Sequence, residues 1–365
     1  MKIPAPAGNS REFPSPVDSK ARAGDKPPNR NFLEGTTSPG VAGDAVLIEY
    51  APFIEGFVNA LAAGIMTGAL FGLMCAGVGL IYGVMGVVNF AQGEFMMLGM
   101  YAALFLTNFF LQSALGPIFG PFVAALLAGP VIFCLGWITH VGLLRLVTGI
   151  RGATQEAAGH YAQLILTLGL SLILANGGLI VFGSTPAAVR TPLTTKAFQF
   201  ELMGDGDVTL FLNQDRVVVT VIAVLLAALL WVFVHSTRTG RAMRAAAYNP
   251  DAATYVGIDV DRQHRMAFSI GVAATAIAGG LLATYLSFQP YVGAEFVIVM
   301  YAGVVLGGVG SILGAFWGGM VIGLVQQMSG LFLDLQLQST AIFVVFLLVL
   351  LFRPQGLFGR SAERT

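Results

Sequence analysis

Asn249-Pro250-Asp251-Ala252-Ala253-Thr254-Tyr255-Val256-Gly257-Ile258 is the stretch from which the organisation of this chain can be worked out. The order of its residues predicts a short helix with a defined start and end. Asn249 can cap the first free N–H groups, Pro250 suits the first helical position, and Asp251 places a negative charge near the positive helix end. Gly257 is placed to end the helix in a left-handed turn.

The segment around this helix is the most basic part of an otherwise apolar chain. A capped helix in a basic loop between two apolar runs is typical of a docking surface for a cytoplasmic partner. The surrounding arginines are Arg238, Arg241, Arg244, Arg262 and Arg265.

Composition places the protein in a membrane. The chain has 365 residues, of which 56% are hydrophobic and only 10% charged, and its mean hydropathy is +0.78. A soluble domain carries about 25% charged residues. The formal net charge is zero, so no overall positive field indicates nucleic-acid binding. The composition predicts an all-α, polytopic helix bundle with about eight or nine transmembrane helices.

Three regions follow from the pattern. Residues 1–50 are rich in proline and poor in large apolar side chains, which predicts a disordered tail. Residues 51–358 form the transmembrane domain, with a basic loop at 238–263, and 359–365 form a short cytoplasmic C-terminal tail. The predicted spans are 56–82, 91–112, 120–144, 161–182, 216–235, 264–288, 297–312, 314–333 and 338–352.

The Lys and Arg residues predict the orientation. The loops at 145–160 and 236–263 and the C-terminus carry arginines, whereas the 183–215 loop is mostly acidic, so the first three are predicted inside and the fourth outside. Nine spans with an inside C-terminus place the N-terminus outside, but the basic tail favours inside. A re-entrant or broken helix at 83–95 is one resolution, and the side of the N-terminus stays open.

Asn89, Gln92 and Glu94 are polar residues within a long apolar stretch. An ionisable group inside the membrane is costly and suggests a functional site. Asn89 and Gln92 have capping-box spacing, so a helix is predicted to begin here, with an N-terminus suited to an anionic group. The alternative is that these residues only satisfy a helix break or an interface.

A second segment resembles this one. Glu94-Phe95 is followed by Met100-Tyr101-Ala102, and Glu295-Phe296 is followed by Met300-Tyr301-Ala302. An internal repeat would place interrupted helices at corresponding positions and frame a translocation path that includes Glu295. The two spacings differ by one residue, so chance is the alternative. The sequence contains no Walker loop, catalytic triad or metal-ligand spacing, so we predict no ATP hydrolysis or enzymatic activity in this chain.

These segments together resemble the permeases of the branched-chain amino acid ABC transporter family, the high-affinity leucine/isoleucine/valine uptake type. The resemblance covers roughly residues 55–360. It depends on Gly79 to Gly83, on Asn89-Phe90-Ala91-Gln92-Gly93-Glu94, on Gly240 to Ala245 followed by Val256-Gly257-Ile258, on Val305 to Ser311, and on Arg353 to Arg360. Family members typically have His where this chain has Gln92. The Asp-Ala-Ala-x-x-x-Gly pattern from Asp251 is similar to the Glu-Ala-Ala-x-x-x-Gly coupling loop of ABC importer permeases.

The resemblance implies a multi-pass permease of the bacterial inner membrane. It implies a sister permease subunit or a second copy, two cytoplasmic ATP-binding subunits that hold ATP and magnesium, and a periplasmic substrate-binding protein. No cofactor is expected in this chain. Residues 240–258 would couple ATPase motion to transport. The candidate coupling residues are Arg241, Arg244, Asn249, Asp251, Ala252, Ala253 and Gly257.

Two other functions stay open. The same family also serves urea and short amides, and the sequence does not separate these substrates from amino acids. A stand-alone secondary transporter, with Glu94 and Glu295 in ion coupling, is the alternative from a different class.

Overall fold

A computed structural model describes residues 41–110, 116–145, 156–201, 208–334, 337–353 and 355–359. The chain divides into two units, Met1–Leu47 and Ile48–Thr365. Of the first unit only the opening turns of one helix are described, and that helix begins at Val41, within the stretch predicted as a tail. The rest of the predicted disordered tail and most of the C-terminal tail lie outside the described residues.

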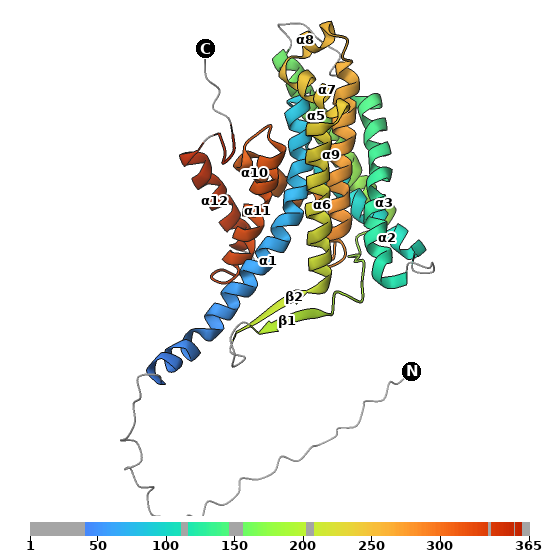
Figure 1. The fold of residues 1–365 in the computed structure, drawn as a ribbon. Coiled ribbons are helices and arrows are strands. Elements are labelled where there is room, and N and C mark those ends of the chain that lie inside the picture. Colours follow the sequence, from blue (N-terminus) through green and yellow to red (C-terminus); the bar gives the residue numbers. More distant parts are fainter. Residues whose placement is uncertain are drawn as a thin grey trace, which may run out of the picture. The chain divides into compact units, whose positions relative to one another are not determined.

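The second unit is a helix bundle with one short β-hairpin (Figure 1). Each predicted span overlaps one helix, so the helical membrane fold is confirmed. The elements are α1 Val41–Met85, α2 Gln92–Phe110, α3 Gly116–Thr139 with its π-helical extension η1 His140–Leu144, α5 Glu156–Phe182, β1 Ala197–Glu201, β2 Thr209–Asn213, α6 Gln214–Ser236, α7 Arg238–Tyr248, α8 Pro250–Tyr255, α9 Val260–Leu282, α10 Val292–Gly307, α11 Ile312–Ser329 and α12 Gln338–Phe352.

Seven helices within the described residues are long and apolar enough to cross a membrane. These are α1, α2, α3 with η1, α5, α6, α9 and α11. The other two predicted spans, α10 and α12, are apolar but shorter, with 16 and 15 residues. Both are shorter than the roughly 20 residues that a helix needs to cross the hydrocarbon layer.

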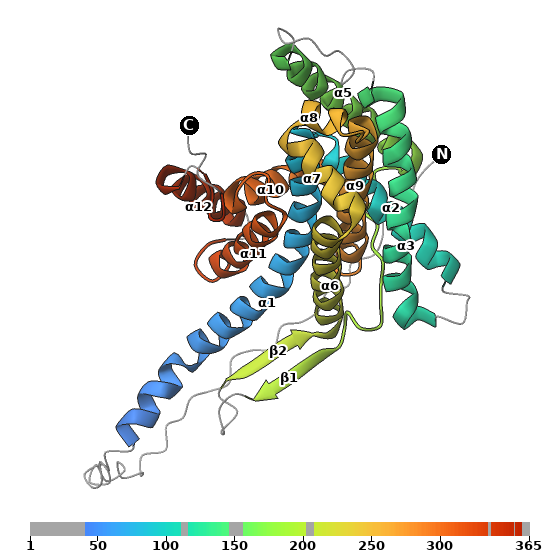
Figure 2. The same cartoon turned by 45° about the horizontal axis from the view of Figure 1, so that its top comes forward.

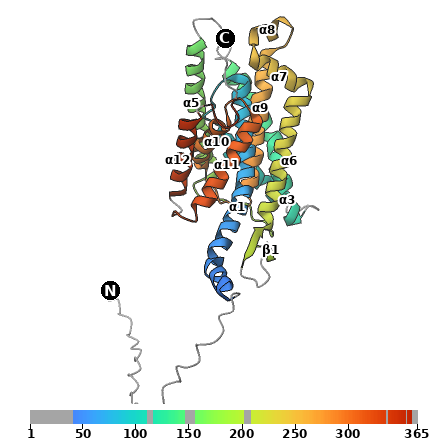
Figure 3. The same ribbon diagram turned by 60° about the vertical axis from the view of Figure 1, so that its left-hand side comes forward.

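Glycines hold α1 against α11. A Cβ on Gly68 would overlap Met320, and one on Gly72 would overlap Phe316. The spacing of four residues places both glycines on one helix face, and the absence of side chains lets the two backbones approach closely. Figure 3 shows α10, α11 and α12 grouped beside α1.

The bundle has two distinct ends. The short helices α7 and α8 lie at one end, and the β-hairpin lies at the other (Figures 1 and 2). The turn between α10 and α11 joins the α7–α8 end, because Gly310 lies against Gly83 near the end of α1. The part of α1 around Asn59 lies at the hairpin end, since Asn59 is hydrogen-bonded to β2.

The hairpin is a feature that the all-α prediction did not include. β1 and β2 pair antiparallel, with Phe198 opposite Leu212 and Phe200 opposite Leu210. These residues lie in the 183–215 segment, which the sequence analysis interpreted as a loop. The predicted re-entrant segment at 83–95 is a break: α1 ends at Met85, Gly86 has a φ of 68°, and α2 begins at Gln92 and runs back.

Candidate functional site

The turn from α6 into α7 depends on Thr237 and Gly240. The Thr237 hydroxyl donates to the Phe233 carbonyl at 2.6 Å and accepts from the Gly240 N–H at 3.0 Å, which caps α7. A Cβ on Gly240 would overlap the Val234 carbonyl. Only glycine therefore allows α7 to turn so sharply out of the spanning helix α6.

Helix α8 begins and ends at the predicted capping residues. The Asn249 side-chain oxygen accepts from the Ala252 N–H at 2.9 Å, Pro250 is the first helical residue, and Asp251 lies in the first turn. Gly257 has a φ of 84°, the left-handed conformation that was predicted. Ala253 is buried beside Ala246 of α7 and Val260 of α9, so this alanine attaches α8 to its neighbours.

The rest of α7 and α8 forms an exposed surface, which we call the α7–α8 surface. Tyr248, Tyr255 and Val256 are 94%, 89% and 76% exposed. These three residues are not among the candidates predicted from the sequence, although large side chains beside a capped polar helix were the available signal. Exposed tyrosines of this kind are enriched at protein–protein contacts. The surface also includes the exposed candidates Arg241, Arg244, Asn249, Asp251 and Ala252.

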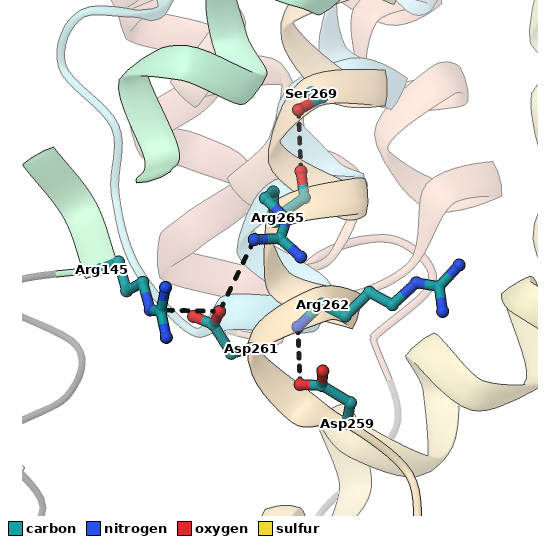
Figure 4. A network of polar contacts seen from close by, with 6 residues as sticks. All are labelled: Arg145, Asp259, Asp261, Arg262, Arg265 and Ser269. Carbon is teal, nitrogen blue, oxygen red and sulfur yellow. Dashed lines mark hydrogen bonds and ion pairs between the residues drawn. The ribbon is translucent and has the colours of Figure 1, made fainter. Parts of the chain in front are cut away.

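Ion pairs and a cation–π contact connect the start of α9, which follows α8, to the end of α3. Asp261, in the first turn of α9, pairs with Arg145 at 3.6 Å and with Arg265 at 3.9 Å (Figure 4). The Arg265 guanidinium also lies over the Trp137 ring, 4.4 Å from its centroid. Asp259 caps α9 by accepting from the Arg262 N–H at 3.0 Å. These contacts join the start of α9 to the end of α3.

The interior candidates Asn89 and Gln92 form a closed hydrogen-bond group. The Asn89 amide donates to the Gln92 side-chain oxygen at 3.0 Å, and the Gln92 amide donates to the Thr275 hydroxyl at 2.6 Å and the Gly271 carbonyl at 3.3 Å. Asn89 also accepts from the Ala91 N–H at 3.2 Å. Both side chains are buried and satisfied within the protein, so they start α2 and join it to α9. Their place in a translocation path stays a prediction.

Glu94 differs from these two residues. Its carboxylate is 2% exposed, one oxygen accepts from Ser171 of α5 at 3.4 Å, and the other has no hydrogen-bond partner among the described residues. Glu295 is exposed and lines a cavity of about 260 Å³ with residues of α12, among them Ser339. The two carboxylates therefore have different surroundings, and their shared place in a translocation path stays a prediction.

The helices that carry these carboxylates cross as an antiparallel pair. A Cβ on Gly93 would overlap the Gly293 carbonyl, so the two backbones touch there. On one side of this crossing Tyr301 exchanges hydrogen bonds of 2.6 and 2.9 Å with the backbone of Asn89. On the other side the ring of Tyr101 lies 5.0 Å from that of Phe288. Each tyrosine follows its glycine by eight residues, 93 to 101 and 293 to 301, but their contacts differ, so the internal repeat stays a prediction.

Within the part of the chain that the structure describes, no group of three or more His, Cys, Asp and Glu side chains is placed to hold a metal ion. The polar groups around Glu94 are a carboxylate, a hydroxyl and backbone groups, which can bind and orient a ligand by hydrogen bonding.

A bundle of helices long and apolar enough to span a membrane, with a buried carboxylate and two short exposed helices at one end, is the architecture of an integral membrane protein. The chain belongs to the family described as branched-chain amino acid transport system / permease component, whose model matches residues 60–352. It is therefore a permease subunit and not an enzyme, and it is a multi-pass protein of the inner membrane.

The match to three relatives extends over nearly the whole length of each of them. The high-affinity branched-chain amino acid transport system permease protein LivH of Salmonella typhimurium is 28% identical over 307 residues, 83% of this chain and 96% of the relative. BraD of Pseudomonas aeruginosa, with the same description, is 29% identical over 311 residues, 85% and 98% of the two chains. The probable LivH permease of Methanocaldococcus jannaschii is 29% identical over 307 residues, 82% and 91%. No solved structure matches the chain.

Proposed function

We propose that this chain is the permease subunit of an ATP-driven importer for branched-chain or related amino acids. Its relatives are described as permeases of such amino acid transport systems, and the match to them covers most of both chains. The proposed complex contains a sister permease or a second copy of this chain, two ATP-binding subunits that hold ATP and magnesium, and a substrate-binding protein outside the membrane.

The α7–α8 surface is the observation that supports a partner-driven mechanism. Three large exposed side chains would be hydrated if the chain worked alone, whereas a protein partner would bury them. Because α8 is joined to α7 and α9 through Ala253, force on α8 reaches two helices. The mechanical step is then a push on α8 that shifts α6 and α9 relative to the rest of the bundle.

Glu94 is the interior residue that we assign to the path. One of its oxygens has no partner among the described residues, so it has hydrogen-bonding capacity for the ammonium group of an amino acid. This assignment concerns substrate passage and is separate from the coupling role of α8.

The experiment is a binding and uptake assay of the complex reconstituted with its own ATP-binding subunits and binding protein. We expect Tyr255→Ala to weaken the association with the ATP-binding subunits by roughly thirty-fold, since a central interface tyrosine contributes about 2 kcal/mol. ATP-driven amino acid uptake should fall with it. Tyr255→Phe keeps the ring and should behave nearly as the wild type.

The controls are the membrane level and the melting temperature of each variant, which should match the wild type because Tyr255 is almost fully exposed. Full association and uptake by Tyr255→Ala and by a second variant, Gly257→Asp, would contradict the coupling role. Uptake that continues without ATP and follows an ion gradient would instead indicate a stand-alone transporter. If the binding protein retains urea or a short amide and no amino acid, the substrate assignment is wrong but the coupling role is unaffected.

A further inference from the structure

The β-hairpin has one wholly apolar face. Successive residues of a strand point to opposite faces, and directly paired residues share a face. Phe198 and Phe200 therefore lie on the same face as their partners Leu212 and Leu210. The two phenylalanine rings are neighbours, with centroids 6.3 Å apart. Phe198 is 45% exposed and Phe200 is 53% exposed, so no other part of the described chain covers this face fully.

The hairpin lies at the level where the membrane begins. β2 ends at Asn213, and the spanning helix α6 begins at the next residue, with the Asn213 side chain as its cap. No linker separates the strand from the span. The two strands run from the start of α6 toward α1, across the direction of the helices and not along it (Figures 1 and 2).

The length of α1 independently places the hairpin at the edge of the hydrocarbon layer. The apolar part of α1 runs over 34 residues from Pro52 to Met85, more than the roughly 20 residues that cross the hydrocarbon layer. Counted back from Met85 at the α7–α8 end, about 20 residues reach to near residue 66. Asn59, which donates to the Thr209 carbonyl at 2.9 Å and accepts from the Phe211 N–H at 2.8 Å, therefore lies just beyond the hydrocarbon.

Contacts with α1 also indicate which face of the hairpin is turned to the membrane. Glu55 lies one helical turn farther out than Asn59 and accepts from the Thr209 hydroxyl at 2.6 Å. The Thr209 side chain belongs to the face opposite the phenylalanines. Because that face, which carries Phe211 as well as the polar residues, is directed to the outer turn of α1, the wholly apolar face is directed inward, toward the lipid.

We propose that the hairpin is a membrane anchor whose apolar face, formed by Phe198, Phe200, Leu210 and Leu212, lies in the interface of the outer leaflet. This face is wholly apolar, whereas the opposite face carries Gln199, Glu201 and Thr209 together with Phe211, which is 48% exposed. An uneven distribution of aromatic and leucine side chains between two faces is characteristic of elements that lie in the plane of the interface. Burying this face in lipid removes apolar area from water at about 25 cal/mol per Å².

Hydrogen bonds join the start of α6, where the hairpin ends, to the connection between α9 and α10. Asp215, in the first turn of α6, is fully buried and accepts from Thr191 at 2.9 Å and from Thr284 at 2.7 Å. Thr284 follows the end of α9 and precedes α10. An anchored hairpin would therefore hold the α9–α10 connection at a fixed depth while the opposite end of the bundle moves.

Spin labelling of the full chain, in its complex with the partner subunits in lipid vesicles, tests the proposal. Cys134 is exposed and is replaced by serine, whereas Cys75 is buried. A nitroxide is attached at Phe198→Cys, Phe200→Cys or, as the matched control on the opposite face, Gln199→Cys. Collision with oxygen reports lipid, and collision with a water-soluble nickel chelate reports water.

We expect the oxygen-to-nickel accessibility ratio at Phe198→Cys and Phe200→Cys to exceed that at Gln199→Cys several-fold. Equal access of nickel at all three positions would overturn the proposal. Shielding of both phenylalanine positions from both reagents would also overturn it, because the face would then be covered by protein, such as a second copy of the chain. Neither result depends on which substrate the complex transports.

Discussion

Glu94 has one buried carboxylate oxygen with no hydrogen-bond partner among the described residues. An unpaired buried polar atom costs free energy, and ligand binding is one way to recover it. Asn89 and Gln92 lie within five residues of Glu94, yet their side chains bond to each other and to α9. The sequence grouped the three residues, and only the contacts separate the carboxylate from the two amides.

Replacing Glu94 with glutamine tests its role in substrate passage. A hydrogen bond to a charged group contributes about 1.5–3 kcal/mol, so Glu94→Gln should lower kcat/KM for amino acid uptake by about ten-fold or more. Association with the ATP-binding subunits should not change. The measurement is the initial rate of uptake by proteoliposomes at several substrate concentrations.

Glu201→Gln is the matched control, because it removes the same charge from an exposed position on β1. It should leave the uptake rate unchanged. Unaltered kinetics in Glu94→Gln as well would make Glu94 a structural residue, held by Ser171 for the packing of α2 against α5.

Pairs of elements show where sequence prediction succeeds and where it ends. The caps of α8 could be predicted because Asn249, Pro250 and Gly257 act on neighbours within a few residues. The hydrogen bond from the Tyr301 hydroxyl to the Asn89 carbonyl joins positions 212 residues apart, so no local sequence pattern can predict it. The hairpin was missed for another reason: Phe198 and Phe200 alternate as strand residues do, but the segment was interpreted from its charges as a loop.

The crossing of α2 and α10 is the contact between elements that we expect to be least tolerant of added volume. Gly93→Ala would push a methyl group into the Gly293 carbonyl, and forced overpacking typically costs about 1–3 kcal/mol. The melting temperature of the purified protein should fall, as measured by thermal unfolding in mild detergent.

Gly177→Ala is the control on helix α5, where nothing lies within 4 Å of an added Cβ. Alanine favours a helix over glycine by about 1 kcal/mol, so this variant should melt at or above the wild-type temperature. If both variants melt alike, the close approach of α2 and α10 is not a constraint on stability.

The orientation of the whole bundle follows from where its charges lie. Among the described residues, the α7–α8 end carries Arg145, Arg238, Arg241, Arg244, Arg262, Arg265 and Arg353, and the hairpin end carries Arg190, Lys196 and Arg216. Lys and Arg are enriched on the cytoplasmic side of membrane proteins. The α7–α8 end should therefore face the cytoplasm, and the part of α1 around Asn59, which bonds to the hairpin, should lie outside.

Two single cysteines in the Cys134→Ser background can measure this orientation. In intact cells with a permeable outer membrane, a membrane-impermeant maleimide should label Gln199→Cys on the hairpin and not Tyr255→Cys on α8. After the inner membrane is opened and the ATP-binding subunits are stripped from it, both positions should be labelled, because both residues are exposed in the chain by itself. Labelling of Tyr255→Cys from outside would mean that the orientation is the reverse of the predicted one, with the α7–α8 end facing outward. It would place the α7–α8 surface on the side where no ATP-binding subunit can reach it, so the coupling role would be lost together with the orientation.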